Sequence, residues 1–389
     1  MFSIELDEAL QRILKIFYRM GIWQRDEESN YRKIGMKMFY TFFGALFLIF
    51  FATNAFLCDD RNESIFSVQI SIAAAILYVK TLYVLFNKQE ILAFLYDPIV
   101  VHSIENREEY DETVKKINKF MNFVRPYCLA IFLTVSLLIV IKLPIFSTDK
   151  GLPLFISFSW NRSEIIYWLA YLFLSLSCFL YATMNLITIL IWYMMLNYSI
   201  DYELLGNKLR KLGVVKKTIA KKAKKQKEFR LTQRSGFVED LIVLVKAHRN
   251  LTETIERFRS FFSTLFLVQI TTSGIIICTS VYSLAFFSNQ SLVQIEFYVV
   301  VLLYAIFDIF LVMYLANGIT VASDRLSYCL FESNWIEQTQ SCKKYVLIMG
   351  EVLKQPQQLV ILIYPMNLES FMTIVNGAYS MFNILQNLQ

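Results

Sequence analysis

The sequence predicts an all-α membrane protein with seven transmembrane helices, and three observations support this fold class. Residues 38–57 form a run of twenty positions without a charge, and the chain repeats such runs about seven times. A helix of that length matches the roughly 30 Å hydrocarbon core of a bilayer. Hydrophobic residues make up 56% of the chain and charged residues 18%, against about 45–50% and 25% in soluble domains. Finally, the runs lack the polar face that soluble helices show to water.

The charge-free runs place the spans at about residues 38–57, 65–86, 126–146, 165–196, 260–287, 297–320 and 370–388. The fourth run is longer than a bilayer requires, so its helix tilts or continues beyond the lipid. We expect one domain over residues 1–389. Its parts are an amphipathic cytoplasmic segment at 1–37, a basic cytoplasmic loop at 198–259, a cytoplasmic anchor segment at 321–365 and a final helix at 370–389.

The distribution of basic residues predicts the orientation. Of the 38 Lys and Arg residues, the predicted outer loops contain four, which are Arg61, Lys142, Lys150 and Arg162. Lys and Arg resist translocation, so the side rich in them is cytoplasmic. The sequence therefore predicts a cytoplasmic N-terminus and, with seven spans, an extracellular C-terminus.

Three acceptor sequons agree with this orientation. Asn62, Asn161 and Asn289 each begin an Asn-x-Ser motif, one in each predicted outer loop, and are candidates for glycosylation. Two further sequons, at Asn197 and Asn250, fall on the predicted inner side. Chance matches therefore occur, and the pattern gives only weak support.

The connecting segments predict helices outside the spans. Apolar residues from Leu6 to Met20 recur at helical spacing, which suits either a helix lying on the inner membrane surface or one packed on the protein's own cytoplasmic face. Residues 323–368 alternate apolar and polar positions, which predicts an amphipathic helix within a compact cytoplasmic anchor.

The basic run at residues 216–230 favours a solvated, unfolded loop, since like-charge runs rarely fold. Binding of anionic lipid headgroups is the alternative. The run is tethered to a membrane and has no aromatic stacking platform, so we expect no nucleic-acid partner.

No residue pattern points to catalysis. The two histidines, His102 and His248, form no metal-binding or general-base motif, and the six cysteines contain no CxxC pair. Neither a GxSxG motif nor a phosphate-binding glycine loop is present in the sequence. We therefore expect no enzymatic activity, no cofactor and no metal site.

Two ionisable residues fall inside predicted spans. Lys80 and Asp308 are costly in lipid, and such residues usually mark a pathway, a pocket or a partner. They are able to pair as a salt bridge, but we expect Lys80 to extend its amine to the inner headgroups instead. For Asp308 we expect a water-accessible or hydrogen-bonded interior position.

Aromatic residues are dense, at 16% of the chain. Tyr171 and Phe173 in the fourth span and Tyr304 and Phe307 in the sixth span are placed to wall an apolar cavity. The competing interpretation for any single aromatic residue is ordinary packing between helices or against lipid.

Local patterns in the last third of the chain resemble a known family. They are a glycine after the sixth span in GITVASDRLSYCLFESNW (318–335), a Gln-Pro pair in KQPQQL (354–359), and a Leu-Glu-Ser-Phe entry with a closing Tyr-Ser-x-Phe in YPMNLESFMTIVNGAYSMFNIL (364–385). Together with seven spans and an inward N-terminus, they resemble the insect odorant receptor family. G-protein-coupled receptors have the opposite orientation.

The resemblance implies the ligand-tuning subunit of a heterotetrameric, odorant-gated, non-selective cation channel that assembles with a shared co-receptor subunit. Such a subunit is expected in the plasma membrane of olfactory sensory neuron dendrites. The final helix would line the pore, with Ile384 and Leu388 in a hydrophobic ring and Asn387 in an amide ring. The alternative is that Ile384 and Leu388 only pack.

The ligand implied by the resemblance is a small, volatile and mostly apolar odorant, bound between the second, third, fourth and sixth spans. Expected contacts are Ile76, Ser136, Tyr171, Phe173, Tyr304 and Phe307. A gustatory-type receptor channel is the nearest alternative, although the Tyr379-Ser380 register argues against it. A transporter is a more distant alternative, because the inverted repeats and broken spans of transporters are not evident in the sequence.

Overall fold

The computed structural model describes residues 6–25, 27, 29–58, 61–96, 104, 106–141, 143, 152, 154, 163–213, 226–286 and 292–387. Leu388, Asn161 and Asn289 lie outside the described residues, as do His102 and most of the basic run. For Asn62 and Asn387 the backbone alone is described.

Each of the seven predicted spans is helical over nearly all of its described residues. Within the part of the chain that the structure describes, six stretches are long and apolar enough to cross a membrane. They are α2 (Asn30–Leu57), α3 (Arg61–Phe86), α5 (Arg107–Ile141), α6 (Glu164–Met184) continued by α7 (Leu186–Arg210), α9 (Gln226–Phe286) and α10 (Leu292–Phe331). The seventh predicted span is α12 (Leu368–Asn387), a helix of 20 residues with more polar side chains. The all-α fold with membrane-spanning helices is therefore confirmed, while the orientation of the termini stays a prediction.

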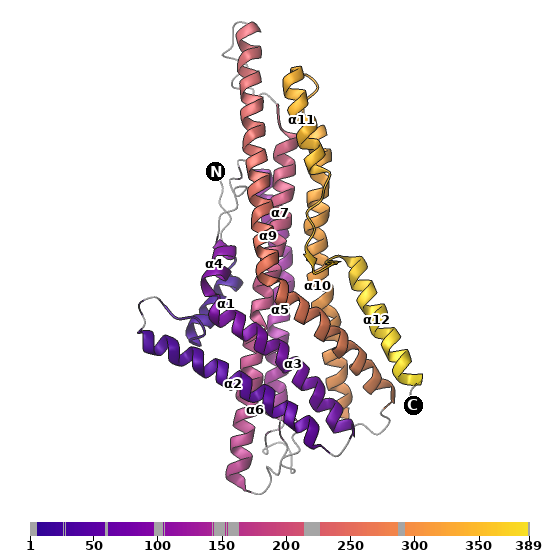
Figure 1. Ribbon diagram of the computed structural model, residues 1–389. Coiled ribbons are helices and arrows are strands. Elements are labelled where there is room, and N and C mark those ends of the chain that lie inside the picture. Colours follow the sequence, from indigo (N-terminus) through magenta and orange to yellow (C-terminus); the bar gives the residue numbers. More distant parts are fainter. Residues whose placement is uncertain are drawn as a thin grey trace.

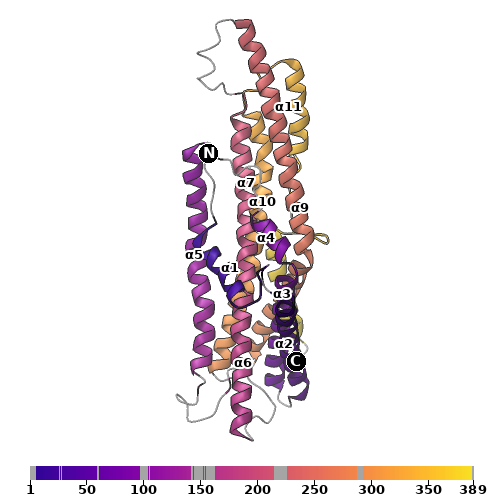
Figure 2. The ribbon, with the colours of Figure 1, turned by 90° about the vertical axis from the view of Figure 1, so that its left-hand side faces the viewer.

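Several helices extend well past the charge-free runs. The helix α9 has 61 residues and α10 has 40. At one end of the molecule α7, α9 and α10 run side by side, with α11 (Gln340–Leu353) along α10 (Figures 1 and 2). We call the extensions of α7, α9 and α10 together with α11 the anchor bundle. Its interior is apolar and aromatic, with Leu205, Phe258 and Leu326 fully buried.

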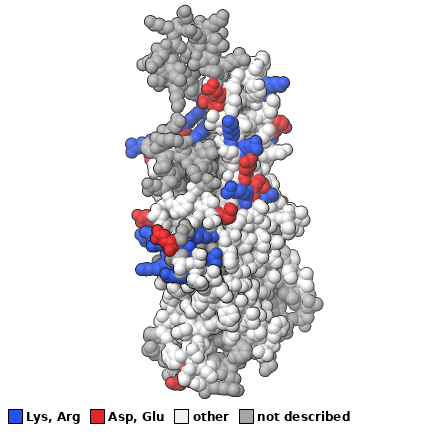
Figure 3. Space-filling view, turned by 60° about the vertical axis from the view of Figure 1, so that its left-hand side comes forward, with Lys and Arg blue, Asp and Glu red and all other residues white. Residues whose placement is uncertain are grey.

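The surface divides the molecule into two halves. On the face shown in Figure 3, the charged side chains gather over the middle and upper part, while the lower part is almost free of them. In the charge-poor half, apolar side chains are exposed, for example Leu172 at 64% and Leu303 at 62%. A surface of this kind suits lipid rather than water. The charge-poor half is therefore the membrane-spanning part.

The N-terminal helix packs on the protein itself. In α1 (Glu8–Arg19) the apolar face, including Leu10, Ile13 and Phe17, is buried in the main core. The chain then turns at Gly21, whose φ of +69° favours glycine. Beyond this turn the Trp23 ring nitrogen donates a hydrogen bond of 2.8 Å to the carbonyl of Val84 in α3. Of the two interpretations of this segment, the structure supports packing on the protein.

A short hairpin reverses the chain before α12. Its strands are β1 (Val360–Ile361) and β2 (Tyr364–Pro365), which pair antiparallel. The Ser370 hydroxyl donates a hydrogen bond of 2.6 Å to the carbonyl of Pro365 and so fixes the first turn of α12 to the hairpin. From there α12 returns along α9 and α10 through the membrane-spanning half (Figure 1). The remaining described helix is the short α4 (Lys88–Tyr96).

Candidate ligand cavity and its polar surroundings

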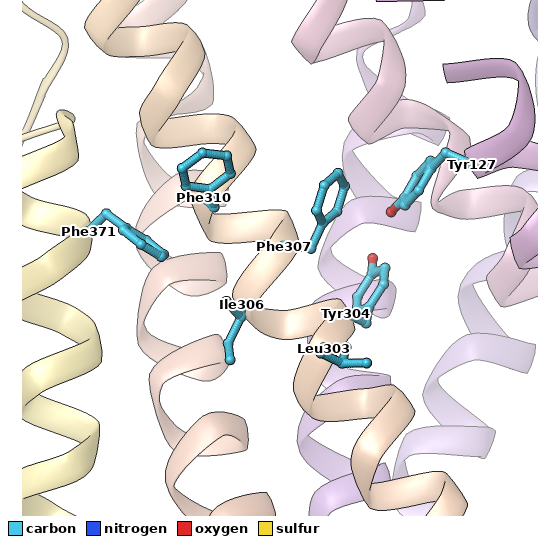
Figure 4. A pocket seen from close by; sticks show the side chains of 7 residues that line it. All are labelled: Tyr127, Leu303, Tyr304, Ile306, Phe307, Phe310 and Phe371. Atoms are coloured by element: carbon cyan, nitrogen blue, oxygen red, sulfur yellow. The ribbon is translucent and has the colours of Figure 1, made fainter. Parts of the chain in front are cut away.

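A pocket of about 530 Å³, open to the surface of the chain, lies between α5, α10 and α12 in the membrane-spanning half, and we call it the cavity (Figure 4). The α10 residues at its wall follow helical spacing, so they share one face of that helix. Pockets for small organic molecules commonly have volumes of about 300–1,000 Å³. The lining residues are Tyr127, Leu303, Tyr304, Ile306, Phe307, Phe310 and Phe371.

Aromatic contacts connect the walls of the cavity. The ring of Phe307 lies 5.6 Å from the ring of Tyr127, centroid to centroid, and thereby joins α10 to α5. On the other side, the rings of Phe310 and Phe371 meet edge to face at 5.4 Å and join α10 to α12. Such geometries are favoured by the ring quadrupoles. The cavity is therefore in direct contact with the helix expected to line a pore.

Two tyrosine hydroxyls are the polar side-chain groups among the residues that line the cavity. Figure 4 shows the hydroxyl oxygens of Tyr127 and Tyr304 facing one another. The Tyr304 hydroxyl donates a hydrogen bond of 2.8 Å to Oδ1 of Asn185. Asn185 occupies the break between α6 and α7. The Tyr304 hydroxyl thus connects the cavity wall to a discontinuity in the fourth span.

A buried charged cluster lies one helical turn beyond Tyr304. Nζ of Lys80 is 4.0 Å from Oδ2 of Asp308, and both side chains are almost completely buried. Lys80 donates a hydrogen bond of 2.9 Å to the Thr188 hydroxyl, and Gln269 donates one of 2.5 Å to Oδ2 of Asp308. A charge inside a bilayer needs partners of this kind.

The cluster corrects one expectation and confirms another. The expectation that Lys80 reaches the headgroups is wrong, because its amine points into the bundle toward Asp308. The physical reason is that the pair and its hydrogen bonds replace the solvation that headgroups would have supplied. Asp308 does occupy a hydrogen-bonded interior position, as the sequence predicts.

The structure does not bring all of the residues expected around the ligand together at one site. Tyr304 and Phe307 line the cavity. Ile76 packs against the main core, whereas Tyr171 and Phe173 belong to a second cluster built on Phe47 and Phe51 from α2 and on Tyr298 from α10. Ser136 is exposed on α5.

Sequence reasoning missed five residues of the cavity. Leu303, Ile306 and Phe310 share the helical face of Tyr304 and Phe307, so their spacing was a usable signal. Tyr127 and Phe371 carry no such signal, because the packing of α5 and α12 against α10 brings them to the cavity.

The final helix has one packed face and one free face. Ala378 is buried where α12 packs against α9 and α10. Met372, Tyr379 and Ile384 are exposed, with 60% of Ile384 accessible. Within the described residues, no three His, Cys, Asp or Glu side chains gather at one place that could hold a metal ion. The cavity and the free face of α12 are therefore the features that any functional interpretation has to explain.

Comparisons with known proteins agree on one family. The family model described as 7tm Odorant receptor matches residues 60–379. The chain is 26% identical to Odorant receptor 94a of Drosophila melanogaster over 98% of this chain and 97% of that protein. It is 23% identical to Odorant receptor 23a of the same species over 62% and 60% of the two chains.

Solved structures show the same fold. The insect olfactory receptor OR5 from Machilis hrabei superimposes with a TM-score of 0.80 at 14% identity, covering 98% of both chains. The same receptor in complex with eugenol gives a TM-score of 0.76 and covers 98% of this chain and all of that one. Because the family model matches most of its length, this protein belongs to the seven-transmembrane odorant receptor family.

Proposed function

We propose that this chain is an odorant receptor subunit that binds a small, volatile, mostly apolar ligand within the membrane. The observation that carries the proposal is the aromatic cavity between α5, α10 and α12, which lies in the half of the molecule suited to lipid. An apolar molecule dissolved in the bilayer reaches such a cavity without crossing water. The solved relative in complex with eugenol supports a small organic ligand for this fold.

We further propose that ligand binding opens a non-selective cation channel. The Phe310–Phe371 contact supports this, since it places the cavity wall directly against α12. A ligand shifts a closed–open equilibrium only as far as it binds the open arrangement more tightly than the closed one. Movement of α10 on binding is passed to α12 through these two rings.

The proposed gate lies at the end of α12. Ile384 and Leu388 would form a hydrophobic ring and Asn387 a polar amide ring around a central pore. A hydrophobic constriction closes a pore by excluding water and opens when its side chains separate. The exposure of Ile384 on the free face of α12 supports this role.

We propose that the pore is completed by other subunits, including a shared co-receptor, in a heterotetramer of the plasma membrane. In the anchor bundle, α11 exposes a stripe of three apolar residues at helical spacing, Tyr345, Ile348 and Val352, each 55% accessible. Soluble surfaces seldom leave such stripes uncovered. Contact with a neighbouring subunit would cover it. Residence in olfactory sensory neuron dendrites and contact with surrounding lipid follow from this role.

The test is current recording in cells that express this chain alone, the co-receptor alone, or both. We expect volatile-evoked cation current that depends on this chain and is lost with the co-receptor alone at the same ligand concentration. Equal responses with and without this chain would contradict the proposal. Uptake of ligand without current would indicate a transporter instead.

A further inference from the structure

We propose that a polar stripe along α12 forms the water-filled wall of the ion pathway, and that the carboxylate of Glu369 concentrates cations at the inner mouth of that pathway. The stripe consists of Glu369, Thr373, Asn376, Ser380, Asn383 and Asn387. This inference rests on the proposed channel function. It adds the residues that contact ions between the inner mouth and the proposed gate.

The six residues of the polar stripe follow the repeat of a helix. Their spacings along the chain are four, three, four, three and four positions. Successive residues of an α-helix are turned by about 100°, so all six lie within about 40° of one line along α12. The opposite side of the helix carries apolar residues, among them Phe371, Ile374 and Ala378.

The polar stripe is turned away from the rest of the chain. Its exposed members are Glu369, Thr373, Asn376 and Ser380, and Asn383 is half-buried. On the opposite side, the Phe371 ring contacts the Phe310 ring of α10, and Ala378 is buried. The apolar side of α12 thus packs on the protein, and the polar side is left for another neighbour.

Lipid is an unsuitable neighbour for this stripe. The helix α12 passes through the membrane-spanning half (Figure 1), and Asn376 lies about 12 Å along it from Leu368. An amide exposed to hydrocarbon at that depth leaves its polar atoms without partners, which is costly. Water supplies hydrogen bonds to the whole stripe at once, so a water-filled pathway fits this side of α12.

The hydroxyl groups of the stripe present acceptors outward. The Thr373 hydroxyl donates a hydrogen bond of 3.0 Å to the carbonyl of Glu369, and the Ser380 hydroxyl donates one of 2.9 Å to the carbonyl of Asn376. A hydroxyl has one proton to donate. Both oxygens therefore offer only lone pairs to the pathway, and oxygen lone pairs are the ligands that hard cations prefer. The stripe favours cations over anions.

Glu369 adds a full negative charge at one end of the stripe. It is the only charged residue in the sequence after Lys354. The first turn of α12 is the end nearer the anchor bundle (Figure 1), on the predicted cytoplasmic side. A carboxylate at a narrow mouth raises the local concentration of cations. Glu369 should therefore assist cations that enter from the cytoplasm and carry outward current.

The first experiment measures single-channel current in inside-out patches from cells that express this chain with the co-receptor, opened by a panel of volatile alcohols, esters and phenols. In Glu369→Gln we expect the outward conductance to fall about twofold at about 0.1 M cytoplasmic salt, and the difference to vanish at about 1 M, where the screening length is only about 3 Å. The inward conductance should change less.

Two controls separate the charge from the fold of α12. Glu369→Asp keeps the carboxylate and should keep the outward conductance near that of the unmodified chain. Asp240→Asn removes an exposed carboxylate from the anchor bundle and should leave both conductances unchanged. A first-turn carboxylate also stabilises a helix through the helix dipole, but that role would not make the loss depend on current direction.

The second experiment tests the wall itself with a cationic, water-soluble thiol reagent applied from the cytoplasmic side of open channels. We expect modification of Thr373→Cys and Asn376→Cys to reduce the current, because each adds a positive charge to the pathway. Ile374→Cys is the matched control on the packed side of α12 and should not respond, as should the unmodified chain.

The outcomes distinguish this inference from the channel proposal. Unchanged outward conductance in Glu369→Gln would overturn the role of Glu369. Unmodified current in both Thr373→Cys and Asn376→Cys would overturn the polar wall, and ligand-evoked current would still support a channel in either case. Absence of current from the unmodified chain with every member of the panel would overturn the channel proposal and this inference with it.

Discussion

Lys80 of α3 and Asp308 of α10 form an ion pair in the interior of the membrane-spanning half, with 4.0 Å between Nζ and Oδ2. Both side chains are nearly inaccessible, at 2% and 4% exposure. Neither charge reaches water or a headgroup, so each is stabilised chiefly by the other and by Thr188 and Gln269. The pair thus links four helices across the bundle.

Removing one member of the pair should cost more than removing both. Lys80→Met leaves Asp308 as an uncompensated buried carboxylate, and Asp308→Asn leaves the lysine in the same position. We expect each single variant to lose about 3 kcal/mol of stability and the double variant to recover most of it. Thermal unfolding in detergent and surface expression measure both effects. Lys246→Met, at an exposed position of α9, is the control, and additive losses in the double variant would contradict the pairing.

Two glycines of α2 should respond differently to the same substitution. A Cβ at Gly44 would lie 2.8 Å from the Tyr78 ring of α3, whereas a Cβ at Gly35 has no such neighbour within 4 Å. Gly44→Leu should therefore destabilise the α2–α3 packing by about 2 kcal/mol. Gly35→Leu, on the same helix, should change little. Comparable unfolding temperatures for both variants would show that α2 and α3 do not pack this closely.

The free face of α12 should be accessible to water if it lines a pore. We expect Ile384→Cys to react with a water-soluble thiol reagent during ligand application, since Ile384 is exposed on that face. Ala378→Cys is the control, because Ala378 is buried against the neighbouring helices. Both cysteine variants are made in a Cys58→Ser background, so that the native Cys58 thiol does not react with the reagent. No reaction at Ile384 in resting or stimulated cells would remove α12 from the pore wall.

Leu388→Ala extends this test to the end of the chain. A smaller side chain in the hydrophobic ring widens the constriction and lowers the cost of wetting it. We expect a higher current without ligand. If the resting current and the ion selectivity were unchanged, Leu388 would be a packing residue and not part of the gate.

The orientation is tested by tags and sequons together. An N-terminal tag should be reached by antibody only after permeabilisation, and a C-terminal tag without it, because the basic residues favour a cytoplasmic N-terminus. Asn62, Asn161 and Asn289 should be the glycosylated sequons, with a mobility shift lost on Asn→Gln substitution. Glycosylation at Asn197 or Asn250 would contradict the predicted orientation, because both sequons lie on the predicted cytoplasmic side.

The sequence predicted the helices that contact lipid, but it did not predict the features that depend on packing between helices. Hydropathy marked each span because an apolar run is required wherever a helix meets hydrocarbon. It did not predict that α9 begins at Gln226, since a helix in water needs no apolar run. Nor did it predict the break at Asn185, which lies inside a stretch without charges.

The site shows the same limit. The hydrophobicity of a span does not determine how its helix is rotated about its own axis. From the sequence, the Lys80 side chain is therefore compatible with contact either with headgroups or with Asp308. The structure places it against Asp308. Helical spacing on α10 does predict a shared face for Tyr304 and Phe307. That Tyr127 and Phe371 join them depends on the contacts of two distant segments.

The unbroken course of α9 has a mechanical consequence. Its 61 residues correspond to about 90 Å of helix at 1.5 Å per residue, and Figure 1 shows that this helix bends in the membrane-spanning half. The long straight part beyond the bend acts as a lever, so a small tilt at the bend displaces the far end of the helix by a larger distance. Small rearrangements around an odorant would thus be magnified far from the bilayer, where a pair of fluorescent labels reports them.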